Sequence, residues 1–115
     1  MLQLTDEDRK LAWLIALKYM SKPILLENLA EECSELSHAA LKLSRCLRGE
    51  NPTPVTLEEA ESRYLEEACD VLVVLSVLGF EPDPETVSKK LERWHKRLVE
   101  RDILFADPNY NEKDL

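Results

Sequence analysis

The organisation of the chain is set by residues 25–47, which read LLENLAEECSELSHAALKLSRCL. On a helical wheel, at about 100° per residue, the apolar residues of this stretch share one face. They are Leu25, Leu29, Leu36, Ala40, Leu43 and Leu47. Glu32 lies at the edge of this face and Glu35 about 60° further round, so both carboxylates are within reach of one ligand. The stretch predicts an amphipathic helix with a pair of acids beside its buried side.

A second acidic pair, Glu67 and Asp70, stands in the same relation to its own helical pattern. Here the apolar face consists of Ala60, Tyr64, Ala68, Val71, Leu75 and Leu78. If the two helices pack side by side, the two acid pairs converge. Carboxylates that lie so close repel one another, whereas a hard divalent ion such as Mg²⁺ takes oxygen ligands. The pattern predicts a metal site, although either pair alone also fits an ordinary solvated helix surface.

The strings that carry these acids are EECSEL at 31–36 and EEACDVL at 66–72. They resemble the ExxE…ExxD signature of the MazG-like, all-α nucleotide pyrophosphohydrolases, and the resemblance extends over residues 23–101. That superfamily also includes dimeric dUTPases, dCTP pyrophosphatases and phosphoribosyl-ATP pyrophosphohydrolase. The resemblance implies a helical bundle, which we expect to be an oligomeric four-helix bundle over residues 1–103. Residues 104–115 show no helical periodicity, and we expect them to be a tail.

The same resemblance implies an activity, in which a nucleoside triphosphate is cleaved to the monophosphate and pyrophosphate, as in house-cleaning of the nucleotide pool. Glu32, Glu35, Glu67 and Asp70 would be both the metal ligands and the catalytic residues. The expected ion is Mg²⁺, with Mn²⁺ as an alternative. Water would attack a phosphorus atom at the bridge between the α- and β-phosphates while a glutamate takes its proton.

Further residues are candidates for binding the substrate phosphates. Lys90 best matches a lysine that follows the acidic signature in MazG-like proteins, and Arg93 and Arg97 follow on the same expected helix. Their charge suits a triphosphate, but a solvated basic helix end fits them as well. Asn28 lies one turn before Glu32 and is a further candidate, or an exposed polar residue.

Start and stop signals divide the chain into four expected helices. Thr5 is a candidate cap for a helix that runs to about Met20, and Ser21-Lys-Pro23 opens a second one that runs to about Leu47. Gly49 to Pro54 reads as a loop. Thr56-Leu-Glu-Glu59 is a capping box for a third helix that ends near Gly79, and Asp83-Pro84 opens a fourth that runs to about Ile103. Because residues 71–78 are apolar on almost every side, we expect a homodimer or homotetramer.

Composition narrows the possible partners. The chain has 115 residues, 33% of them charged, and its net charge of −8 argues against a nucleic-acid binder. We expect a cytoplasmic protein, because neither a signal sequence nor an apolar run long enough for a membrane span is present. Cys33, Cys46 and Cys69 lack the spacing of a zinc site and read as reduced thiols.

Two other functions compete with the nucleotide hydrolase. The strings Glu35-Leu-Ser-His38 and Glu92-Arg-Trp-His95 match the Glu-x-x-His motif of di-iron bundles. Ligands in those bundles point inward, however, and His38 lies about 165° from the centre of its apolar face. The other alternative is a non-catalytic acidic helical adaptor that docks through its apolar third helix. The sequence does not distinguish among bases or sugars of the substrate, nor does it exclude phosphoribosyl-ATP.

Overall fold

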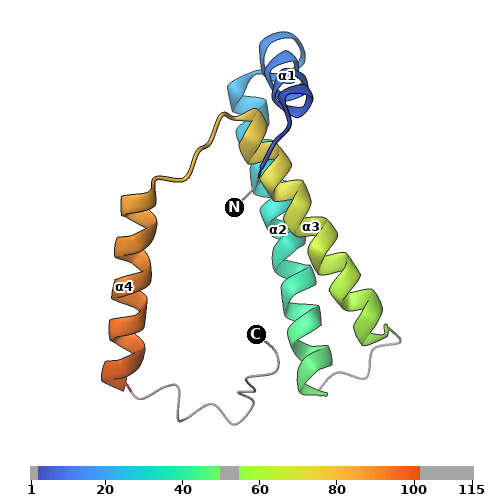
Figure 1. Ribbon diagram of the computed structural model, residues 1–115. Coiled ribbons are helices and arrows are strands. Elements are labelled where there is room, and N and C mark those ends of the chain that lie inside the picture. Colours follow the sequence, from blue (N-terminus) through green and yellow to red (C-terminus); the bar gives the residue numbers. More distant parts are fainter. Residues whose placement is uncertain (1–2, 50–54, 102–115) are drawn as a thin grey trace. The chain divides into compact units, whose positions relative to one another are not determined.

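A computed structural model describes residues 3–49 and 55–101 of the chain. Figure 1 shows its elements: α1 (Asp6–Leu14), η1 (Ile15–Tyr19), α2 (Lys22–Arg48), α3 (Leu57–Val77) and α4 (Pro84–Arg101). Every regular element in these two ranges is helical, which confirms the prediction of an all-α protein. The predicted loop at 50–54, the last residues of the fourth helix and the tail at 104–115 lie outside the described residues.

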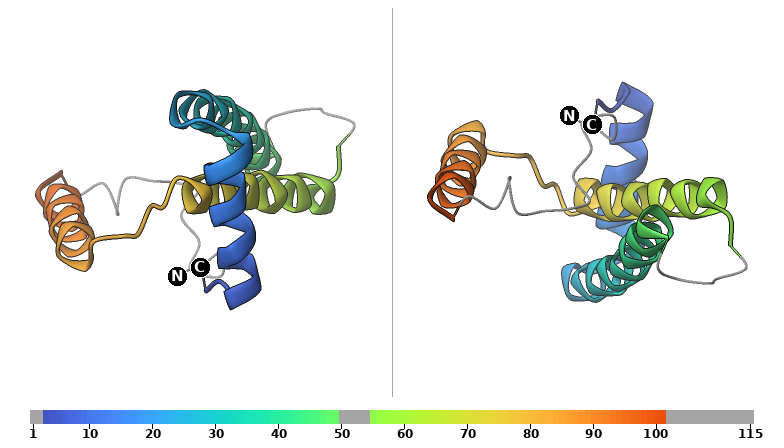
Figure 2. Two further views of the ribbon diagram at one scale, coloured as in Figure 1. Left: turned by 90° about the horizontal axis from the view of Figure 1, so that it is seen from above. Right: turned by 90° about the horizontal axis from the view of Figure 1, so that it is seen from below.

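The chain divides into two compact units, Met1–Phe80 and Glu81–Leu115. In the first, α2 and α3 run antiparallel and side by side (Figures 1 and 2), and α1 lies across the end where α2 begins and α3 ends. The second unit contains α4 and is described by itself. None of the helices within the described ranges is long and apolar enough to cross a membrane.

Small side chains line the contact between α2 and α3. Leu25, Ala39 and Ala60 are the buried apolar residues of the described chain, and Ala60 is only 2% exposed. Most of the predicted apolar faces are at least half-buried, but Leu47 and Tyr64 are exposed. With so few large side chains enclosed, the first unit buries little apolar surface.

Three of the four predicted helix starts have side-chain caps, whereas no side-chain hydrogen bond caps α2 at Ser21. At Thr5 a full capping box forms, because Thr5 Oγ1 accepts from the Asp8 N–H at 3.0 Å while Asp8 Oδ2 accepts from the Thr5 N–H at 3.0 Å. At Thr56 only half of the predicted box is present, with Thr56 Oγ1 accepting from the Glu59 N–H at 3.1 Å. Asp83 Oδ2 accepts from the Thr86 N–H at 3.2 Å and caps α4.

The first helix departs from the expected single α-helix. After Leu14 the chain makes one π-helical turn, Ile15–Tyr19, and becomes extended at Met20 with φ −134° and ψ 121°. A π turn accommodates an additional residue and rotates the side chains that follow it.

Gly79 ends α3 in a Schellman motif. The Gly79 N–H donates to the Ser76 carbonyl at 3.0 Å and the Phe80 N–H donates to the Leu75 carbonyl at 2.9 Å, while Gly79 itself has φ +80°. A Cβ at this position would meet no atom within 4 Å, so only backbone strain opposes a side chain.

Replacing Gly79 by Ala is therefore expected to lower the free energy of unfolding by about 1–2 kcal/mol, the cost of a left-handed conformation for an L-residue. Urea denaturation monitored by circular dichroism measures this change. Gly79→Asn should cost less, since Asn tolerates the left-handed region. Equal stability of Gly79→Ala and the unchanged protein would contradict the assigned backbone conformation.

Candidate metal centre

The pairing of α2 with α3 brings Glu32, Glu35 and Glu67 together. Each offers a carboxylate oxygen, and the three oxygens lie within 4.8 Å of one another. Glu32 and Glu35 are one turn apart on α2, and Glu67 faces them from α3. Three of the four acids predicted from the sequence thus form a cluster between two neighbouring helices.

The cluster contains buried oxygen atoms without a hydrogen-bond partner. Glu67 is 7% exposed, and the Oε2 atoms of Glu32 and Glu67 are both buried and unpartnered. A buried carboxylate oxygen without a partner is destabilising, because it has lost the water that would solvate it. The cluster is therefore short of donors or of positive charge.

The cation paired with this cluster is Arg63, one turn before Glu67 on α3. Its Nη2 lies 3.8 Å from Glu67 Oε1, while the Arg63 side chain is 71% exposed. An ion pair this long, with one partner in solvent, compensates a buried carboxylate only weakly.

The pKa values of half-buried Glu32 and buried Glu67 are both raised above the ordinary value of a glutamate. Burial raises the pKa of Glu32, and the charges of Glu35, Asp70 and Glu31 raise it further. Burial is also the largest cause that raises the pKa of Glu67. The hydrogen bond with the Glu35 carboxyl and the charges of Glu35 and Asp70 raise this pKa further, whereas the charge of Arg63 lowers it. A bound cation would relieve the same repulsion that favours protonation.

Asp70 stands beside the cluster. It is half-buried on α3, and its charge acts on both Glu32 and Glu67. It is not among the three residues whose oxygens lie within 4.8 Å of one another. Asn28 is half-buried on α2, one turn before Glu32, as the sequence indicates.

The basic residues proposed for phosphate binding lie elsewhere in the chain. Lys90, Arg93 and Arg97 are exposed on α4, in the second compact unit. Their assignment to the substrate phosphates stays a prediction. His95, with the second Glu-x-x-His string, lies on the same helix and is exposed.

The donor set fits a hard divalent ion. All three groups supply oxygen, the atom that Mg²⁺ and Mn²⁺ prefer in proteins. Ligands at about 2.1 Å from Mg²⁺ lie about 3–4 Å apart in an octahedron. The spacing of up to 4.8 Å needs only small side-chain rotations to reach that geometry. The unpartnered oxygens of Glu32 and Glu67 supply acceptors for the ion.

These pKa shifts predict how stability depends on pH. The folded-state pKa of Glu32 and Glu67 is raised above the ordinary 4.5, so their stabilising contribution is complete below 4.5 and is lost as pH rises through the folded-state pKa. Asp8 and Asp83 have pKa values below the ordinary 3.8, so their contribution is lost only at lower pH. The metal-free chain should therefore gain stability from neutral pH down to about pH 4.5.

The stabilisation of the chain by Mg²⁺ should instead increase with pH, because the carboxylates must be deprotonated to bind the ion. Thermal melts with and without Mg²⁺ between about pH 5 and pH 8 measure both effects. Glu67→Gln should weaken both. A melting-temperature shift caused by Mg²⁺ that does not change with pH would contradict the assignment of these carboxylates to the ion.

The MazG-like resemblance stays a prediction from the sequence. No family model, curated protein or solved structure matches this chain.

Proposed function

We propose that this chain is a Mg²⁺-dependent nucleoside triphosphate pyrophosphohydrolase of the MazG-like type. The observation that supports it most is the cluster of three carboxylate oxygens within 4.8 Å of one another, two of its acids having a buried and unpartnered oxygen. A chain with a net charge of −8 repels a polyphosphate unless a cation mediates the contact.

Each residue of the cluster has a role in this proposal. Glu32, Glu35 and Glu67 would hold the ion, and Asp70, whose charge acts on both Glu32 and Glu67, would be a fourth ligand. Bound Mg²⁺ supplies positive charge to the phosphate oxygens and lowers the pKa of a coordinated water. Glu35, the exposed member of the cluster, is the best placed to take a proton from the attacking water.

The test is a panel of nucleoside triphosphates, with phosphoribosyl-ATP included, assayed for pyrophosphate release with Mg²⁺ and with Mn²⁺. The expected result is metal-dependent release of pyrophosphate and a monophosphate from at least one substrate. Release of inorganic phosphate instead, or no reaction with any nucleotide, would overturn the proposal.

An adaptor is the second candidate, and the exposed apolar side chains of α3 favour it. Leu65, Leu72 and Val73 are all exposed, Val73 by 58%. An adaptor would neither be stabilised by Mg²⁺ nor hydrolyse nucleotides, so the panel separates the two functions.

The same apolar surface supports a homo-oligomer of the four-helix-bundle type, in which a second copy of the chain covers α3. We expect a dimer or tetramer by light scattering, and dissociation in Val73→Glu, because a charge in an apolar interface is costly. A monomer in solution would contradict this part of the proposal. A cytoplasmic location belongs to the same proposal.

A further inference from the structure

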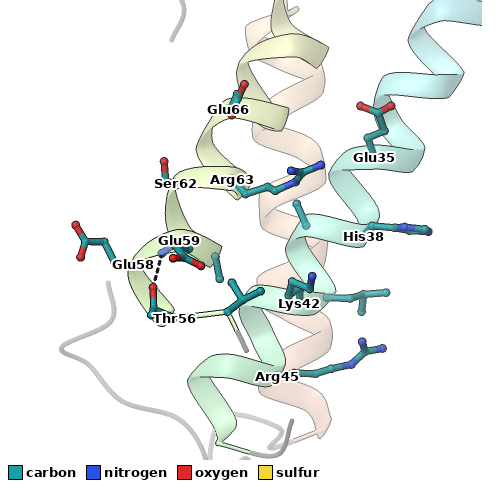
Figure 3. Close-up of a pocket in the computed structure, with 14 residues that line it drawn as sticks. Glu35, His38, Lys42, Arg45, Thr56, Glu58, Glu59, Ser62, Arg63 and Glu66 are labelled. Atoms are coloured by element: carbon teal, nitrogen blue, oxygen red, sulfur yellow. Dashed lines mark hydrogen bonds between the residues drawn. The ribbon is translucent and has the colours of Figure 1, made fainter. Parts of the chain in front are cut away.

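An open groove of about 1360 Å³ adjoins the metal centre, and Glu35 belongs to both. Its walls come from α2 and α3, with the small side chains of Ala39 and Ala60 among the lining residues. Three basic side chains line it (Figure 3): Lys42 and Arg45 from α2, and Arg63 from α3. Sequence reasoning assigned a role to none of them.

The α2 wall presents its cations in a row that starts at the metal centre. Lys42 and Arg45 follow Glu35 by seven and ten residues, which places all three on one face of the helix. At 1.5 Å per residue they stand about 10 Å and about 15 Å along the axis from Glu35. A chain of phosphates that begins at the ion can extend along this row.

The opposite wall carries negative charge. Glu58, Glu59 and Glu66 of α3 line the same groove. In Figure 3 Glu58 and Ser62 lie on the side of α3 away from α2, whereas Arg63 extends towards α2. A polyanion in the groove is therefore directed to the α2 wall and to Arg63.

Arg63 connects the groove with the metal centre. Its guanidinium lies 3.8 Å from Glu67 Oε1. A divalent ion bound to Glu67 takes up the same carboxylate and repels the guanidinium at short range. Since Arg63 is largely exposed, it is free to turn to another anion, and its planar donors suit a phosphate.

We propose that Lys42, Arg45 and Arg63 bind the polyphosphate part of the ligand in this groove, and that metal binding to Glu67 releases Arg63 for that contact. The proposal rests on the proposed function and extends it. It assigns phosphate binding to the α2–α3 groove and orders the two events, metal first and phosphates second.

Inorganic pyrophosphate is the probe for the groove. Its affinity is measured by calorimetry at saturating Mg²⁺ for the unchanged protein and for Lys42→Ala, Arg45→Ala and Arg63→Ala. Each variant should bind about tenfold or more weakly, as expected for the loss of a charge-assisted hydrogen bond. Lys22→Ala is the matched control, because Lys22 lies as many residues before Glu32 on α2 as Lys42 lies after it, yet does not line the groove.

The release of Arg63 is tested by Mg²⁺ titration without pyrophosphate. Arg63→Ala should bind Mg²⁺ more tightly, because a competing counter-ion of Glu67 is gone, and Arg63→Lys should lie between the two. Unchanged or weaker Mg²⁺ binding by Arg63→Ala overturns the release of Arg63. Pyrophosphate affinities that match the Lys22→Ala control in all three variants overturn the groove itself.

These outcomes are separate from those of the nucleotide panel. Binding of pyrophosphate that depends on the groove cations, with no nucleotide hydrolysed, would refute the proposed hydrolase and leave the groove assigned. Nucleotide turnover that does not change when the three cations are replaced would support the proposed hydrolase and refute the assignment of the groove. Circular dichroism of each variant shows that its helices are retained.

Discussion

Replacing Glu67 by Gln is expected to abolish Mg²⁺-dependent pyrophosphate release, with kcat/KM lower by about a thousandfold or more. Glu67 is the most buried member of the cluster and the only one contributed by α3. An amide of the same shape keeps the packing but removes the charge that holds the ion. Steady-state assays with the best substrate of the panel measure the loss.

The structure offers a matched control and an independent readout for this variant. Glu61→Gln removes the same charge from an exposed site on α3 that lies outside both the cluster and the groove, and should keep full activity. Without Mg²⁺, Glu67→Gln should be at least as stable as the unchanged protein at neutral pH, because a poorly compensated buried acid is gone. Full activity in Glu67→Gln would remove this residue from the mechanism.

Leu25→Ala is expected to have the largest effect on folding, lowering the free energy of unfolding by about 2–4 kcal/mol. Leu25 is 4% exposed, and it is the one large aliphatic side chain that is buried within the described residues. Truncation loses its transfer free energy and leaves a cavity between the helices. Urea denaturation at fixed protein concentration measures the change, since an oligomer's stability depends on concentration.

Leu26→Ala is the natural control, because Leu26 is the next residue of the same helix and is 48% exposed. It should cost less than about 1 kcal/mol. Equal losses in the two variants would show that the face of α2 that packs inward is not the one described.

The helices were predictable because their signals are local. Thr5, Thr56 and Asp83 each place an oxygen where a helix needs an acceptor for its first N–H groups, and Gly79 supplies the positive φ at the end of α3. The π turn at Ile15–Tyr19 carries no comparable signal. No motif in the sequence marks it.

The cluster of acids was predictable in part. The spacing of Glu32 and Glu35 fixes their common direction from α2, and the apolar faces indicate that α3 packs against it. The axial offset between α2 and α3 decides which carboxylate oxygens come close to one another, and a helical wheel does not represent that offset. This is why Glu67 joins the two glutamates while Asp70 stands beside them.

The three groove cations were not predicted from the sequence. Lys42 and Arg45 could have been found from the sequence, because they share a helical face with Glu35. The resemblance directed attention to Lys90 on α4 instead. Arg63 required the structure, since its significance lies in the contact with Glu67 and in the side of α3 that it occupies.

The most direct test of the metal centre is a crystal structure of the chain grown with Mn²⁺, with anomalous diffraction to locate the ion. We predict an anomalous peak between α2 and α3, with carboxylate oxygens of Glu32, Glu35 and Glu67 as ligands of the ion. A well-ordered structure with no peak there, or with the Mn²⁺ bound only at other acids, would contradict it.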